Sequence, residues 1–160
     1  MKKVEEKTNV MRILDKLKIN YKSYDYSNSA AVNGMEVAQI LNQDPNQVFK
    51  TLVTVGKSGT NYVFVIPVNK ELDLKKAAQS VGEKNIEMVK SKDLLALTGY
   101  IHGGCSPIGM KKFFTTTINK TAENFDTIIF SAGKIGYQVE LSIEDLKKAI
   151  KFNLADITVS

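Results

Sequence analysis

The chain has 160 residues, 43% of them hydrophobic and 24% charged, which predicts one globular domain over residues 1–160. A chain of this length buries enough surface to fold without a disulfide or a metal. One cysteine, Cys105, excludes an internal disulfide, and one histidine, His102, leaves too few ligands for the usual zinc sites. The apolar runs are far shorter than the roughly 20 residues of a membrane helix. We therefore expect a soluble, reduced, cytoplasmic protein without a metal.

The charge is basic, with 22 lysine and arginine residues against 17 acidic residues, giving a net charge of +5. This balance suits an acidic partner such as nucleic acid, although on charge alone a lysine-rich solubilised surface is the better explanation. Arg12 is the one arginine. Because lysine lacks the bidentate geometry that reads bases, any contact with nucleic acid should be directed at the backbone and sensitive to salt.

The first half of the chain is predicted to contain two short helices and a hairpin. Apolar residues at positions 10, 11, 14 and 17 predict an amphipathic helix, followed by an extended segment over 18–26. Asn33 and Glu36 have the spacing of a capping box, which predicts a helix up to residue 41. The β-rich runs 48–55 and 61–68 are joined by a glycine-containing turn and predict a hairpin.

The second half mixes helices, strands and one irregular loop. Asp73 and Gly82 are typical of the two ends of a helix. After the helix come a strand at 86–89, a helix from 91 to 98, the irregular segment 100–109, strands at 113–118, 126–131 and 136–141, a helix over 142–151 and a last strand at 156–159. Helices and strands do not alternate regularly, so we expect a mixed α/β fold. Its sheet should be mostly antiparallel and curled into a partly closed barrel, with helices around it.

Lys50 is the first candidate functional residue because it interrupts a strand that is apolar on both faces. Val48 and Leu52 share its face, and such a strand is normally covered on both sides. The lysine therefore either extends its stem so that the charge reaches water, or points its ammonium into a pocket. The spacing leaves both readings open.

Two glycine-containing segments are further candidates. Residues 103–109 hold three glycines and a proline, so their backbone could approach a carbonyl oxygen or a phosphate, or form an ordinary turn. Residues 131–136 read as a hairpin turn. A pairing of His102 with Cys105 would suit nucleophilic catalysis, but a buried, inert cysteine is the better interpretation.

Three segments resemble the YbaK family of aminoacyl-tRNA deacylases, within the YbaK/ProX editing-domain superfamily. They read VFKTL at 48–52, GYIHGGCSPIGMKK at 99–112 and SAGKIGYQVEL at 131–141. The resemblance extends over essentially the whole chain. It implies the barrel-like fold expected above and the removal of cysteine from mischarged tRNA(Pro). It also implies that the protein acts at the 3′ aminoacyl end of tRNA, without a cofactor, in a transient ternary complex with prolyl-tRNA synthetase.

The resemblance also implies functional residues. Lys50, Gly103 and Gly104 match the catalytic lysine and the glycines whose backbone would hold the substrate carbonyl. The positions that match the substrate pocket of the family are Tyr26, Thr51, Ser131, Gly133 and Gln138. Relatives often carry aspartate at the position of Gln138, arginine at that of Ile135, and an aliphatic residue at that of Cys105. These departures put a charged role for Gln138 in doubt and argue against a catalytic thiol.

The family shows no protein nucleophile, which leaves two routes for cleaving the ester. The thiolate of a cysteinyl substrate could attack its own ester carbonyl and form a cyclic thiolactone, with the protein supplying orientation. For alanyl-tRNA(Pro) or another small amino acid, a bound water would have to attack instead. A non-catalytic module that binds tRNA or the synthetase is the third hypothesis.

Overall fold

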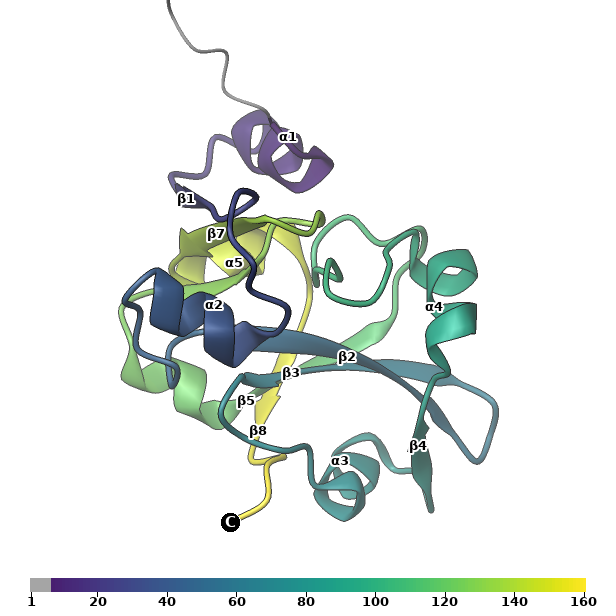
Figure 1. Cartoon of the computed structure of the whole chain (residues 1–160). Helices are drawn as coiled ribbons and strands as arrows, with labels where there is room; N and C mark the ends of the chain where they lie inside the picture. Colours follow the sequence, from purple (N-terminus) through teal and green to yellow (C-terminus); the bar gives the residue numbers. More distant parts are fainter. Residues whose placement is uncertain (1–6) are drawn as a thin grey trace, which may run out of the picture.

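The computed structural model describes residues 7–160, so residues 1–6 of the expected domain lie outside the described residues (Figure 1). The described part has five α-helices: α1 (Asn9–Lys16), α2 (Gly34–Ile40), α3 (Leu74–Val81), α4 (Ser91–Thr98) and α5 (Ile143–Ala149). Its eight strands are β1 (Lys22–Asp25), β2 (Phe49–Gly56), β3 (Asn61–Pro67), β4 (Ile86–Met88), β5 (Thr115–Asn119), β6 (Ile128–Ser131), β7 (Tyr137–Leu141) and β8 (Asn153–Ala155). A 3₁₀-helix, η1 (Lys120–Asn124), follows β5. The predicted mixed α/β class is confirmed.

The strands form two sheets, ordered β1-β7-β6 and β4-β2-β3-β5-β8. The pairs β3–β5 and β5–β8 are parallel and the other four are antiparallel, which confirms the mostly antiparallel expectation. The sheets meet where Val48, just before β2, forms a parallel bridge with Ile129 of β6. Among the described strands neither sheet pairs its two edge strands with each other, so the partly closed barrel stays a prediction.

Side chains cap α2 and α3 where the sequence predicts. Asn33 accepts a hydrogen bond from the backbone N–H of Glu36 at 3.0 Å, and Asp73 caps α3 in the same way. Gly82 ends α3 with a φ of +75°, a conformation that costs glycine little. Each capped amide would otherwise lack a partner in the first turn of its helix.

The two faces of β2 pack against different parts of the molecule. Phe49 and Val53 belong to the main core. Helices α1, α4 and α5 cover this core, together with residues 103–109, which we call the glycine-rich loop. Val48 lies on the opposite face in a small cluster with Ala38 of α2, and Leu52 packs against a third cluster with residues of α3. The predicted alternation along this strand is therefore confirmed.

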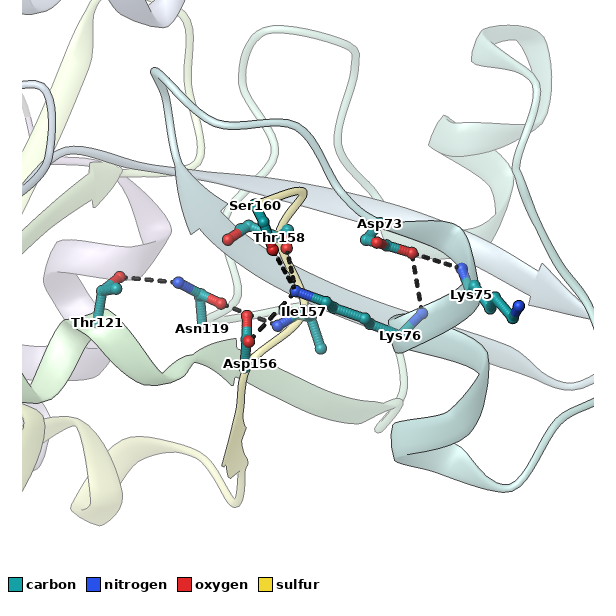
Figure 2. Close-up of polar contacts among 9 residues, drawn as sticks. All are labelled: Asp73, Lys75, Lys76, Asn119, Thr121, Asp156, Ile157, Thr158 and Ser160. Carbon is teal, nitrogen blue, oxygen red and sulfur yellow. Dashed lines mark hydrogen bonds and ion pairs between the residues drawn. The ribbon is translucent and has the colours of Figure 1, made fainter.

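The predicted last strand at 156–159 is wrong in position: the strand is β8, Asn153–Ala155, beside β5. The pairing of β5 with β8 ends before Ile157. The backbone N–H of Ile157 donates to the side-chain Oδ1 of Asn119 at 3.0 Å instead of to the backbone of a neighbouring strand. Beyond it, the Nζ of Lys76 donates to the carbonyl of Thr158 at 2.9 Å (Figure 2). Side chains far away in the sequence thus hold the C-terminal segment, which a local pattern cannot reveal.

Replacing Asn119 with alanine should destabilise the fold by about 1–3 kcal/mol, because the substitution leaves the buried N–H of Ile157 without an acceptor. Asn119 is 1% exposed, so water cannot replace the side chain. Urea unfolding measures the change. Lys147→Ala, which removes an exposed ion pair of α5, serves as the control and should shift stability by less than about 1 kcal/mol. Equal losses in both variants would contradict this role of Asn119.

Candidate active site

Lys50 lies on β2 between the two apolar clusters that α2 and α3 cover. It pairs in register with Ile66 of β3 and is half-buried. Within residues 7–160 its ammonium forms no hydrogen bond or ion pair. A half-buried charge without a carboxylate partner keeps its full attraction for an anionic ligand.

The bridge between the sheets brings Ser131 beside Lys50. Val48 and Ile129 are bridge partners on parallel chains, and Lys50 and Ser131 each follow two residues later. Because side chains alternate along a strand, both then lie on the face of the bridge pair. The Oγ of Ser131 accepts a hydrogen bond from the N–H of Gly133 at 3.1 Å. The hydroxyl hydrogen of Ser131 therefore remains available for donation to a ligand. Two of the sequence-predicted site residues therefore come together.

Gln138 continues the same face onto β7. It pairs in register with Ser131 of β6 and with Tyr24 of β1, and it is 4% exposed. Its Oε1 accepts a hydrogen bond from the Nε2 of Gln43, which follows α2, at 2.9 Å. A neutral amide pair therefore stands where the resemblance implies an aspartate.

The glycine-rich loop packs against the segment that follows β6. A Cβ on Gly104 would lie 3.1 Å from the backbone nitrogen of Ile135, so a side chain there would force the two segments apart. The N–H of Gly104 donates to the carbonyl of Ile101 at 3.0 Å. Of the two predicted glycines, Gly103 is thus the one whose N–H is not engaged by the backbone of the described residues.

Gly133 belongs to the core side of the fold. Its φ is +87°, and an added Cβ would lie 2.9 Å from the ring of Tyr100 and 3.0 Å from Val10. The hydroxyl of Tyr100 in turn donates to the carbonyl of Ile108 in the glycine-rich loop. These contacts account for a glycine at 133 through packing alone.

Thr51 and Tyr26 complete the set of predicted positions. Thr51 lies on the core face of β2, opposite to Lys50, and its Oγ1 is buried without a hydrogen-bond partner among the described residues. The structure does not bring its hydroxyl to Lys50. The backbone N–H of Tyr26 donates to the carbonyl of Gly136 at 2.7 Å, which fixes this half-buried tyrosine beside the turn between β6 and β7.

A carboxylate network on the same face was missed by sequence reasoning. Glu140 of β7 accepts hydrogen bonds from the hydroxyl of Tyr24 and, at 2.5 Å, from that of Thr127. The bond to the carboxylate raises the pKa of Tyr24 to about 12, so this phenol stays protonated. Alternation along the predicted strand places Glu140 on the face of Gln138, but no local signal pairs it with a tyrosine 116 residues away.

His102 and Cys105 do not form a catalytic pair in this arrangement. His102 is exposed, whereas Cys105 belongs to the main core and is 8% exposed. Burial raises the pKa of the Cys105 thiol to about 12. A thiol held protonated in an apolar core is a poor nucleophile, which agrees with the inert interpretation.

No helix in the described part of the chain combines the length and apolar character needed to cross a membrane. Within residues 7–160, no three side chains of histidine, cysteine, aspartate or glutamate gather in a way that could hold a metal ion. A hollow of about 390 Å³ is lined by residues of α1 and β1, and another lies beyond the glycine-rich loop. Neither hollow includes Lys50 or Ser131.

Comparison with known sequences identifies relatives of the chain. The model of the aminoacyl-tRNA editing domain matches residues 30–149. An Enterococcus faecalis protein with the provisional name Cys-tRNA(Pro)/Cys-tRNA(Cys) deacylase EbsC is 47% identical over 158 residues, 98% of this chain and 96% of that protein. A proline–tRNA ligase of Shouchella clausii is 32% identical over 76 residues, 48% of this chain and 13% of the ligase.

Solved structures share the fold at low sequence identity. A protein described provisionally as a trans-editing enzyme for prolyl-tRNA synthetase superposes with a TM-score of 0.80 at 20% identity, covering 97% of this chain and all (100%) of that one. The hypothetical protein APE2540 gives a TM-score of 0.85 at 19% identity, covering 94% of this chain and 99% of its own. At these identities the likeness establishes the fold.

The Cys105 thiol should resist alkylation in the folded protein. With a pKa of about 12, about one thiol in ten thousand is ionised near pH 8, and the surrounding core excludes the reagent. Mass spectrometry after iodoacetamide treatment measures the modification, with urea-unfolded protein as the positive control and Cys105→Ala as the blank. Modification of the native protein at the rate of the unfolded chain would contradict the assignment.

Proposed function

We propose that this chain, which belongs to the aminoacyl-tRNA editing domain family, is a deacylase that removes cysteine from mischarged tRNA(Pro). The observation that carries the proposal is the 47% identity, along almost the full length of both chains, to a protein provisionally named a Cys-tRNA(Pro)/Cys-tRNA(Cys) deacylase. The substrate class is an aminoacyl-tRNA, bound at its 3′ aminoacyl end. Two further features of the site support this chemistry.

The first feature is the positive charge of Lys50, which has no ion-pair partner among residues 7–160. In this proposal the ammonium of Lys50 neutralises negative charge near the ester or the terminal phosphate. The N–H of Gly103 donates to the ester carbonyl oxygen as charge develops on it. Ser131 and Gln138, on the same face as Lys50, contact the amino acid, and Tyr26 flanks it. The other three predicted residues have a structural role in this proposal: Gly104, Gly133 and Thr51. Their packing in the loop and the core fixes the positions of the residues that contact the substrate.

The second feature is the lack of an activated nucleophile on that face. Cys105 lies in the core, and the hydroxyl of Ser131 has no hydrogen-bonded base among residues 7–160. In the proposed step the thiolate of the substrate attacks the ester carbonyl, so that a sulfur–carbon bond forms and the ester carbon–oxygen bond breaks. The proton that the substrate thiol lost when it became the thiolate is returned, through solvent, to the departing ribose oxygen, and the cysteine leaves as a thiolactone. Holding sulfur and carbonyl together supplies much of the acceleration.

The finer features of the assembly belong to the same proposal. The two sheets, joined at Val48 and Ile129, form one curled, partly closed surface around the site. The protein works in the cytoplasm, beside the prolyl-tRNA synthetase that produces the mischarged tRNA, in a transient ternary complex. The lysine-rich surface of the protein makes mostly sequence-independent contacts with tRNA. The synthetase therefore selects tRNA(Pro) in this complex.

The pure protein should cleave cysteinyl-tRNA(Pro) and largely spare seryl- and alanyl-tRNA(Pro). Serine differs from cysteine by oxygen in place of sulfur, a difference in size worth only about 1–3 kcal/mol in a pocket. The pKa of a thiol, about 8.5, is far lower than that of the serine hydroxyl. If the side chain of the substrate attacks its own ester, this difference in pKa makes cysteinyl-tRNA(Pro) react faster than seryl-tRNA(Pro). A panel of mischarged tRNAs measures this order. Equal rates on all three would refute self-cleavage, and cleavage of the alanyl ester alone would favour the water route.

Replacing Lys50 with alanine should lower the deacylation rate by at least about 10²-fold while the thermal unfolding midpoint changes little, because the half-buried charge has no ion pair to lose. Single-turnover assays and thermal melts measure the two quantities. Lys57→Ala, at the exposed turn between β2 and β3, is the matched control and should behave as the wild type. Undiminished activity in the Lys50 variant would show that this lysine only extends its charge to solvent.

A further inference from the structure

A second basic site lies on the far side of the glycine-rich loop. There a hollow of about 340 Å³ opens between residues 107–116 and the end of α5. Three lysines and three apolar residues dominate its lining: Lys111, Lys112, Lys151, Phe113, Phe114 and Ile150. We propose that this hollow binds the single-stranded 3′ acceptor end of tRNA, with the lysines at its phosphates and Phe113 stacked on an unpaired base. The inference rests on the proposed function, because it names where the same substrate is held.

The positive charge of the hollow is not neutralised by the protein itself. Lys111, Lys112 and Lys151 are exposed, and none of them forms an ion pair with a carboxylate of residues 7–160. No aspartate or glutamate is among the residues that line the hollow. The neighbouring lysines of α5 differ, since Lys147 and Lys148 pair with Glu144 and Asp145 at 3.1 and 3.0 Å. Unpaired lysines in a concave surface are suited to a polyanion.

The two loop lysines have neighbours within the protein, Lys111 along its stem and Lys112 at its ammonium. The backbone N–H of Lys111 donates to the carbonyl of Thr98, and its Cγ lies 3.3 Å from the position that a Cβ on Gly99 would occupy. The Nζ of Lys112 lies 5.8 Å from the ring centroid of the buried Phe114. The packing of the Lys111 stem against Gly99 reduces the entropy that this lysine loses when it binds a phosphate.

Phe113 is a solvent-exposed aromatic side chain beside the lysines of the hollow. It is 67% exposed, whereas the next residue, Phe114, is 7% exposed and belongs to the core. A single exposed apolar residue needs no explanation, but an aromatic ring between lysines is the combination that binds single-stranded nucleic acid. Bases of a duplex are already stacked and cannot use such a ring, so the unpaired end is the part of tRNA that fits.

One continuous segment connects the hollow with the candidate active site. Gly103 and Gly104 lie against Ile135 at one end of the loop, and residues 109–114 line the hollow at the other. A nucleotide chain held at the hollow would therefore be held by the same loop that presents the N–H of Gly103. This geometry explains how a protein with one arginine can hold the reactive end of tRNA without reading its sequence.

Charge-matched double variants test the lysines. Lys111→Gln with Lys112→Gln should weaken binding of a short single-stranded RNA ending in CCA by about tenfold, and should reduce the salt slope by about 1.4, or 0.7 per lost phosphate contact. Lys57→Gln with Lys84→Gln removes two exposed lysines elsewhere and should change the affinity less than about twofold. Fluorescence anisotropy at several salt concentrations measures both. Equal weakening by the two pairs, or none by the first, would overturn the proposal.

Phe113 gives a second, charge-independent test. Phe113→Ala should weaken RNA binding by about tenfold, and Phe113→Tyr should restore it, because stacking needs a ring. At 67% exposure, neither change should lower the melting temperature noticeably. Wild-type affinity in the alanine variant, or tighter binding of a blunt RNA duplex than of the single strand, would contradict the stacking role.

A minimal substrate separates this inference from the proposed function. A cysteinyl ester of adenosine alone is too short to reach the hollow, so the Lys111/Lys112 variant should cleave it at the wild-type rate and show a raised KM only for cysteinyl-tRNA. Loss of activity on both substrates would move these lysines into the active site and overturn the assignment. If the wild type cleaves neither ester, the proposed deacylase function fails, while RNA binding still decides whether the hollow is a nucleic-acid site.

Discussion

The bridge between Val48 and Ile129 is the contact on which the candidate site depends. It joins the two sheets and sets the start of β2 beside β6, strands separated by some 80 residues of chain, as the hydrogen bond between Gln47 and Thr127 also shows. Without it, Lys50 and Ser131 would lie on separate sheets with no fixed relation. The apolar cluster around the bridge, which Ala38 of α2 covers, stabilises this junction by excluding water.

The local features of the fold could be predicted from the sequence, and the long-range ones could not. The caps at Asn33 and Asp73 and the alternation around Lys50 depend on residues a few positions apart, so their patterns are visible in the chain. The position of β8 depends on Asn119, and the hydroxyl of Tyr24 depends on Glu140; both partners are distant in sequence. The alternation also places Thr51 away from Lys50, although the resemblance places them in one pocket.

The site is chemically sparse, and that sparseness is consistent with the proposed reaction. It offers one cation, a serine hydroxyl, backbone amides and neutral amides, and the carboxylate of Glu140 holds the phenol of Tyr24 protonated. Such groups can orient an ester and stabilise charge on its oxygen, but they do not supply a nucleophile. The substrate then has to bring the reactive group, which ties the chemistry to the identity of the misattached amino acid. The Gln43–Gln138 pair fits this view, because a neutral amide at position 138 does not repel the substrate thiolate as an aspartate would.

The most direct measurement is a rapid-quench reaction of the protein with cysteinyl-tRNA(Pro) in ¹⁸O-labelled water, followed by mass spectrometry of the released cysteine species. The account predicts that the first product is an unlabelled thiolactone, which incorporates ¹⁸O only as it hydrolyses later in solution. Free cysteine that carries ¹⁸O from the earliest time points, with no thiolactone before it, would contradict the account and assign the attack to bound water.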